Sequence, residues 1–86
     1  MAKVLVPTHL QSYTRRAEVD AAGATLAEVL ADLDTRFPGL RFRIIDEQDH
    51  VRTHIKFFIA GQATDDLSHP VGADHEVMIV AALSGG

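Results

Sequence analysis

The last apolar segment of the chain is the feature that most constrains its fold. Residues 76–83, EVMIVAAL, are apolar at almost every position, so an extended chain here would be apolar on both faces. Strands of this kind are typical of the centre of a sheet. The sequence therefore predicts a central buried strand at 76–83. The rest of the chain must supply its neighbouring strands and a covering layer.

One amphipathic helix is predicted to supply that layer. Thr25 and Glu28 have the spacing of a capping box, in which two side chains satisfy free backbone N–H groups at a helix start. Apolar residues then recur on one helical stripe, at Leu26, Val29, Leu30, Leu33 and Phe37. Pro38-Gly39 is a stop signal. We therefore expect a helix over residues 25–37.

The other predicted strands are shorter. Residues 2–7 and 16–21 are expected to pair as a hairpin, the second alternating between apolar and acidic side chains. Residues 54–63 predict a further strand with a turn at Gly61 and a short return strand. Two stretches are predicted to lack regular structure. They are the polar, turn-like residues 9–16 and residues 40–54, expected to form a short irregular or edge segment followed by an acidic loop.

The order of these elements predicts the architecture. Two strands, a helix and three further strands suit a two-layer α+β domain. If the final strand lies beside the first and parallel to it, with the helix across the sheet, the fold is a β-grasp, the ubiquitin-like fold. We expect a mixed sheet of four to five strands. Residues 1–83 would form the domain and residues 84–86 a free, flexible Ser-Gly-Gly tail.

Composition excludes several classes of function. The chain has 86 residues, enough for one domain, and a net charge of -4, which argues against nucleic acid as a partner. It has no cysteine, and hence no thiolate metal site, disulfide or cysteine nucleophile. No apolar run approaches the roughly 20 residues of a membrane span, and the N-terminus does not resemble a signal peptide. We expect a cytoplasmic protein that does not bind membranes.

The final Gly85-Gly86 pair offers one reactive group, the α-carboxylate of Gly86. Glycines lack side chains, so such a tail can enter a narrow channel. A carboxylate needs activation, most simply as an acyl-adenylate, but the chain has no GxxxxGK[ST] loop to hold ATP. A partner would supply that chemistry. The activated carbonyl could then accept sulfur or a lysine amine. Alternatively, the tail is inert and the domain is a binding module.

The whole pattern resembles the MoaD/ThiS family of ubiquitin-like sulfur carriers. The final SHPVGADHEVMIVAALSGG resembles the end of that family. VLVPTHLQSYT, GATLAEVLADLDTRFPGL, IIDE and VRTHIKFFI resemble its subgroup of thiocarboxylate carriers linked to cysteine biosynthesis. The likeness covers nearly the whole chain.

This resemblance implies a carrier and not an enzyme. An E1-like adenylyltransferase/sulfurtransferase would adenylate Gly86 and convert it to a thiocarboxylate, with Gly85 giving a flexible approach. No cofactor would be bound, ATP being consumed by the partner. A sulfur-accepting synthase would be the second partner, and the free carrier would be a monomer. The acceptor stays open among a cysteine-forming synthase, a molybdopterin precursor, a thiamine thiazole and a tRNA base.

Partner contacts are expected close to the tail. Phe57 and Phe58 are adjacent in a strand and must point to opposite faces, so one is predicted in the core. The other is predicted either to cover the sheet or to mark a partner surface. We expect Phe58, Leu83 and Ser84 to touch the partner.

Other polar groupings are interpreted as surface features. The histidines at 50, 54, 69 and 75 lack the spacing of a zinc site, and the carboxylates at 46, 47 and 49 suit a solvated turn. A triad of His9, Ser12 and Asp20 has no support in the sequence. The basic residues concentrate at Arg15, Arg16, Arg41 and Arg43, either as a solvated face or toward an acidic partner.

Overall fold

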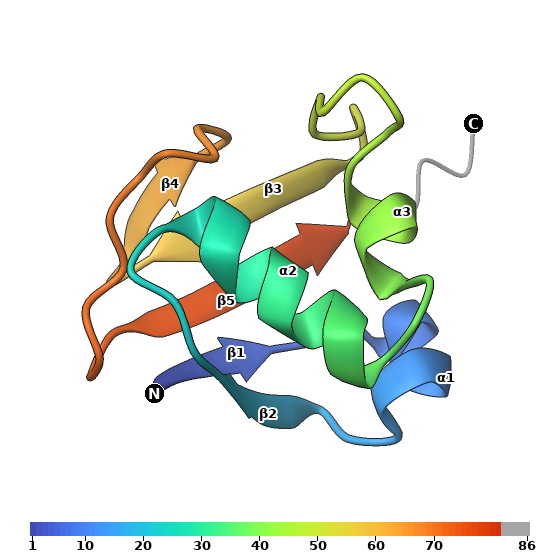
Figure 1. The fold of residues 1–86 in the computed structure, drawn as a ribbon, viewed down its shortest axis with the longest axis horizontal. Helices are drawn as coiled ribbons and strands as arrows, with labels where there is room; N and C mark the ends of the chain where they lie inside the picture. Colours follow the sequence, from blue (N-terminus) through green and yellow to red (C-terminus); the bar gives the residue numbers. More distant parts are fainter. Residues whose placement is uncertain (82–86) are drawn as a thin grey trace.

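The structure of the chain is a computed structural model that describes residues 1–81. Its sheet has five strands in the order β2-β1-β5-β3-β4 (Figure 1). The elements along the chain are β1 Ala2–Leu5, η1 Thr8–Leu10, α1 Gln11–Thr14, β2 Glu18–Ala21, α2 Leu26–Arg36, α3 Leu40–Ile44, β3 Ile55–Ile59, β4 Gln62–Thr64 and β5 Glu76–Ala81.

The last strand is the centre of the sheet, as predicted. β5 runs parallel to β1, with Lys3 opposite Glu76 and Leu5 opposite Met78, and antiparallel to β3 on its other side. β1 and β2 form the predicted antiparallel hairpin. β4 is the short return strand after the turn at Gly61, whose φ of 83° favours glycine. This mixed topology confirms the β-grasp fold.

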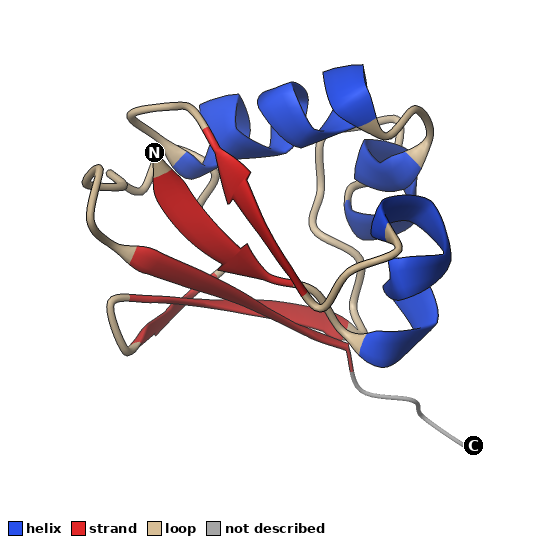
Figure 2. Cartoon of the chain, turned by 90° about the horizontal axis from the view of Figure 1, so that it is seen from below, coloured by secondary structure: helices blue, strands red, loops and turns tan. Residues whose placement is uncertain are grey.

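Helix α2 covers one face of the sheet, and Figure 2 shows the described helices on that side and at one end of the strands. The predicted stripe is buried at Leu26, Val29, Leu30 and Leu33, while Phe37 is partly buried just after the helix. The hydroxyl of Thr25 accepts from the Glu28 N–H at 3.3 Å. The Glu28 carboxylate accepts from the Ala24 N–H at 2.9 Å, one residue before the partner that a capping box would use. The predicted start of the helix is thus confirmed with a shifted reciprocal bond.

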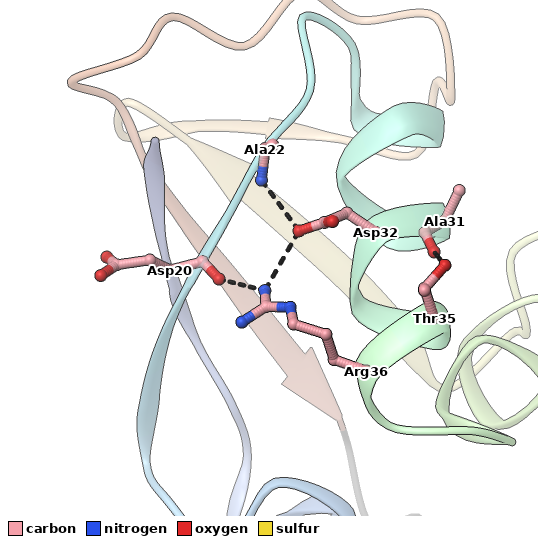
Figure 3. Close-up of polar contacts among 6 residues, drawn as sticks. All are labelled: Asp20, Ala22, Ala31, Asp32, Thr35 and Arg36. Carbon is pink, nitrogen blue, oxygen red and sulfur yellow. Dashed lines mark hydrogen bonds and ion pairs between the residues drawn. The ribbon is translucent and has the colours of Figure 1, made fainter.

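A polar cluster ties the second half of α2 to the neighbouring strand β2 (Figure 3). The carboxylate of Asp32 accepts from the Ala22 N–H at 3.0 Å and pairs with Arg36 at 3.1 Å. The Arg36 guanidinium also donates to the carbonyl oxygen of Asp20. These contacts hold the helix over the edge of the sheet as well as over its centre.

The prediction of a polar turn over residues 9–16 is wrong, because most of this stretch is helical. Leu10 and Thr14 are four residues apart, which places them on one side of a helical turn, and both are buried. The Thr14 hydroxyl donates to the carbonyl of Arg16 at 2.7 Å, so its burial leaves no unsatisfied oxygen. Two buried side chains thus outweigh the polar composition.

The irregular or edge segment predicted from residue 40 is also wrong, since residues 40–44 form helix α3. Leu40 and Ile44 are fully buried, whereas Phe42 between them is 56% exposed. Leu40, Phe42 and Ile44 alternate with two arginines as in a strand, but the spacing of four between Leu40 and Ile44 fits one helical face equally well. The Asp34 carboxylate decides it locally by accepting from the N–H groups of Gly39 and Arg41 at 3.1 and 3.2 Å.

The prediction that the final strand is buried on both faces is wrong for one face. Met78 and Val80 are 38% and 37% exposed, while Val77 and Ile79 point into the core. With one helix layer on one side, the described chain provides no cover for the other face of β5. Phe57 is fully buried and Phe58 lies half-buried on the open face, so their predicted opposite orientation is confirmed.

The predicted boundary between a domain of residues 1–83 and a tail of residues 84–86 lies outside the described residues and stays a prediction. Within residues 1–81, no helix has the length and apolar character needed to cross a bilayer.

Candidate functional site

The predicted reactive residues follow the end of β5. Leu83, Ser84, Gly85 and Gly86 lie outside the described residues, so their roles stay predictions. The described chain ends at Ala81, which pairs with Ile55 at the start of β3. β3 therefore pairs with the central strand as far as Ala81, whereas the pairing with β1 ends at Met78. The surface around Ala81 is what a partner approaching residues 82–86 would meet.

An apolar patch lies on the open face of the sheet and leads toward Ala81. We define the open-face patch as Leu5, Phe58, Met78 and Val80. Met78 lies on β5, between Leu5 of the neighbouring strand β1 and Phe58 of the neighbouring strand β3. Clusters of exposed apolar side chains commonly mark interaction sites. The structure thus places Phe58, the one predicted partner residue within the described chain, in such a patch.

The patch continues into a groove at the end of β5. Residues Pro7, Thr8 and His9, which follow β1, form one wall, and Met78 through Ala81 form the other. A second hollow on the other side of Val80 is lined by Phe58, Lys56 and His54. The apolar patch therefore borders imidazole and ammonium groups near the end of the central strand.

The other polar groupings do not form sites in the described chain. No group of three or more His, Asp or Glu side chains within residues 1–81 could hold a metal ion. The ring nitrogen of His75 accepts from the Gly72 N–H at 2.8 Å, and that of His69 lies 2.9 Å from the Pro70 carbonyl. Within residues 1–81, no hydrogen bond joins any two of His9, Ser12 and Asp20. These histidines act in local turns or on the surface.

The acidic turn is organised by its own backbone. The Asp46 carboxylate accepts from the N–H groups of Gln48 and His50 at 2.9 and 3.0 Å. The hydrogen bond from His50 is the main cause that lowers the pKa of Asp46 below its ordinary value. Asp49 pairs with Arg41 at 3.0 Å. A solvated turn was predicted here, and the structure adds that two of its carboxylates, Asp46 and Asp49, have partners within the chain.

Sequence reasoning did not identify Leu5, Met78 and Val80 as surface residues. A signal was present, because a two-layer domain with one main helix can cover only one face of its sheet. An apolar run on both faces of the central strand must then leave alternate side chains uncovered. Applied to residues 76–81, this argument predicts an exposed apolar face.

These features define a class of protein. It is a ubiquitin-like β-grasp domain that has an uncovered apolar face on its last strand and a Gly-Gly pair at the end of its sequence. Residues 4–86 match the ThiS family. The chain belongs to the ThiS family, and this membership together with the fold supports a sulfur-carrier role. The small carriers of this family are substrates of partner enzymes rather than catalysts.

Solved structures share this fold. CysO in the BexX/CysO complex of Amycolatopsis orientalis is 26% identical, with a TM-score of 0.91 and 100% of both chains covered. CysO of Mycobacterium tuberculosis is 22% identical at a TM-score of 0.89, covering 96% of this chain and 100% of that one. Small archaeal modifier protein 1 of Methanosarcina acetivorans is 22% identical at 0.83, covering 99% and 95%. The last two show the fold alone. No curated protein sequence matches the chain.

Proposed function

We propose that this protein is a sulfur carrier whose Gly86 carboxylate is adenylated by an E1-like enzyme and converted to a thiocarboxylate. The observation that carries the proposal is the ThiS family match, which extends through the Gly-Gly end to residue 86. The resemblance of several segments to carriers of cysteine biosynthesis favours a cysteine-forming synthase as the acceptor. The likeness to CysO at 26% identity supports that choice.

The chemistry requires two successive substitutions. A carboxylate oxygen of Gly86 attacks the α-phosphorus of ATP and expels pyrophosphate, giving an acyl-adenylate. Hydrosulfide supplied by the sulfur donor then attacks the carbonyl carbon. The C–S bond forms as the C–O bond to AMP breaks, and loss of one proton leaves the thiocarboxylate. The chain has no phosphate-binding loop, so the partner holds the nucleotide and this protein binds no cofactor. Because the reaction consumes ATP, we place it in the cytoplasm.

The open-face patch would hold the activating enzyme close to the reacting group. Ser84-Gly85-Gly86 spans at most about 10 Å when extended. From Ala81, where β5 ends, the five remaining residues reach at most about 18 Å, so an enzyme that acts on Gly86 must sit within that distance of Ala81. Phe58, Met78 and Val80 offer it an apolar surface there, with Leu83 and Ser84 expected at its border. The free carrier is expected to be a monomer that meets its partners through this surface.

A second candidate is a protein modifier joined to lysine amines through Gly86. It is favoured by the fold shared with small archaeal modifier protein 1. Both candidates begin with the same activation at Gly86. They differ in the nucleophile, sulfur or a lysine amine, that attacks the acyl-adenylate.

Intact-mass spectrometry tests the proposal after incubation with the cognate activating enzyme, ATP and a sulfur donor. The expected product has one oxygen replaced by sulfur, localised to the peptide that ends in Gly86. A modification on an internal side chain would contradict the carrier mechanism. High-mass products in which the tail is joined to lysines would favour the modifier instead.

Three tail variants sharpen this test, with ATP–pyrophosphate exchange as the measurement. Deleting Gly86 shortens the reach and should abolish exchange. Gly85→Val adds a β-branched side chain where backbone must pass and should impair it. One Ala added after Gly86 moves the carboxylate past the reacting position and should be nearly as damaging as the deletion. Thermal melts should barely change, since none of the three touches the core. Full activation of the Ala-extended protein without trimming would mean that the tail is not recognised as a terminus.

A further inference from the structure

A basic groove lies at the same end of the sheet as Ala81. Three segments distant in sequence form it: η1, α3 and the residues before β3. We define the basic groove as His9, Leu10, Phe42, Arg43, Arg52 and His54, which enclose about 370 Å³. Four of the six side chains are basic and none is acidic. The basic groove therefore has the opposite charge to the chain as a whole, whose net charge is -4.

Arg52 is held in place within the basic groove. Its Nε donates to the Phe42 carbonyl at 2.8 Å, and its backbone N–H donates to the Ile44 carbonyl at 3.0 Å. Its guanidinium lies over the Phe42 ring, 4.7 Å from the ring centre. A cation over an aromatic face is stabilised by the ring, and fixing it in advance lowers the entropy lost on binding. The exposed Phe42 thus has a role as a support for Arg52.

Like Arg15 and Arg16, the arginines of the basic groove lack the carboxylate partners that Arg36 and Arg41 have within the described chain. Arg36 is paired with Asp32 at 3.1 Å and Arg41 with Asp49 at 3.0 Å. Arg43 and Arg52 form no ion pair with any residue of the described range 1–81. The charge of Arg52 contributes to lowering the pKa of Asp46, but the two side chains form no ion pair. Two positive charges outside ion pairs, that of Arg52 held in place, can attract an acidic group from another molecule.

The basic groove is continuous with the open-face patch. His9 lines both the basic groove and the groove at the end of β5, which Met78 and Val80 also line. His54 lines the basic groove and also the hollow that contains Lys56 and Phe58. The surface near Ala81 therefore has an apolar centre and a basic border, and an apolar centre with a polar rim is the usual build of a protein interface.

We propose that the basic groove binds acidic side chains of the enzyme that activates Gly86, placed around the entrance to its adenylation site. This inference rests on the proposed function. The short reach of the tail forces that enzyme onto this end of the domain. Activation is also the step that a sulfur carrier and a protein modifier share, so the occupant does not depend on the nucleophile that follows. Opposite charges across such a surface increase the rate of encounter and fix the orientation of docking.

A matched pair of charge reversals tests the inference in ATP–pyrophosphate exchange with the cognate activating enzyme. Arg43→Glu reverses an exposed charge in the basic groove, and Arg16→Glu makes the same change before the edge strand β2, outside the groove. Arg43→Glu should raise the KM for the carrier about tenfold at low salt with kcat unchanged. Arg16→Glu should stay within about twofold. Arg43→Lys, which keeps the charge, should restore most of the affinity.

Salt and a second variant complete the test. Raising the ionic strength should increase the KM of the parent and narrow its gap to Arg43→Glu, because salt screens exposed charges beyond about 10 Å at 0.1 M. Lys56→Glu, on the other border of the open-face patch, should act in the same direction. Thermal melts verify that each variant is folded.

Equal effects of Arg43→Glu and Arg16→Glu, or a parent KM that does not depend on salt, would overturn the inference while the proposed function stands. Normal activation with slower sulfur transfer would also overturn it, by making the sulfur acceptor the occupant. If the parent itself is never activated, the proposed function fails and this inference with it.

Discussion

The two faces of β5 present the same kinds of side chain in opposite environments. Val77 and Ile79 are 0% and 3% exposed beneath α2, whereas Met78 and Val80, which alternate with them, are 38% and 37% exposed. All four residues are apolar, so hydrophobicity does not distinguish the faces. The difference arises from the one helix layer. One face of the strand provides stability, and the other is available for contact with a second protein.

The largest expected effect is on the covered face. Leu30 is 1% exposed in the middle of α2, so Leu30→Ala should lower the free energy of unfolding by about 2–5 kcal/mol. Denaturant unfolding measures the loss. The fraction that stays folded should be activated at Gly86 as well as the parent. A variant as stable as the parent would mean that the stripe does not face the core.

An identical substitution on each face isolates the effect of the covering layer. Val77→Ala removes a fully buried side chain and should cost about 1.5–3 kcal/mol of unfolding free energy. Val80→Ala removes a partly exposed one and should cost about 0.5 kcal/mol or less. Both are read from urea unfolding curves. Equal losses would indicate that the open face is covered in solution by something absent from the isolated sheet.

The order of the two valines should reverse in a binding measurement. Val80→Ala trims the open-face patch and should raise the KM of the activating enzyme for the carrier several-fold, roughly 1 kcal/mol. Val77→Ala, measured at a temperature where it remains folded, should leave the KM near the parent value. A Val80→Ala protein activated like the parent would remove Val80 from the partner surface.

The smallest expected effect concerns pH. Thr14 is the single buried polar residue within residues 1–81, so the covered face has no ionisable side chain there. Acid sensitivity then depends on surface turns such as that of Asp46, whose pKa is lowered from 3.8 mainly by the His50 N–H. A lowered folded pKa gives stability that is present above pH 3.8 and is lost as pH falls through the folded pKa.

Asp46→Asn provides the comparison, because its amide oxygen can accept the same N–H bonds without a titrating charge. The parent should be slightly more stable than the variant at neutral pH, and the difference should shrink on acidification below pH 3.8. Thermal melts across pH 2–7 measure it, with Asp20→Asn as a control, since the Asp20 side chain makes no hydrogen bond within the described chain. A difference independent of pH would mean that the charge of Asp46 does not matter.

The parts of the fold that were predicted correctly have strong local signals. Helix α2 has a capping threonine, an apolar stripe and a Pro-Gly stop, and the hairpin has alternation. The short helices were missed because their burial depends on two side chains each, such as Leu40 and Ile44, whose spacing also fits a strand. Tertiary contacts and the Asp34 cap decide between the two, and neither is visible in a window of five residues.

The site was only partly predictable for a similar reason. The family resemblance directs attention to Gly86, and the Phe57-Phe58 pair indicates that one aromatic faces outward. The basic groove draws on three segments, so no linear pattern reveals it. The concentration of arginines noted in the sequence contributes only Arg43 to the groove, while Arg52 comes from elsewhere and Arg41 is neutralised by Asp49.

The parallel pairing of β1 with β5 has a mechanical consequence. Because the two strands point the same way, with Lys3 beside Glu76 and Leu5 beside Met78, a force that pulls the start of β1 and the end of β5 apart acts along both strands. It loads the backbone hydrogen bonds between them in shear, all at once, and cannot peel them open singly. We expect a machine that pulls on this domain from its C-terminal end to meet high resistance at the first strand that it has to extract.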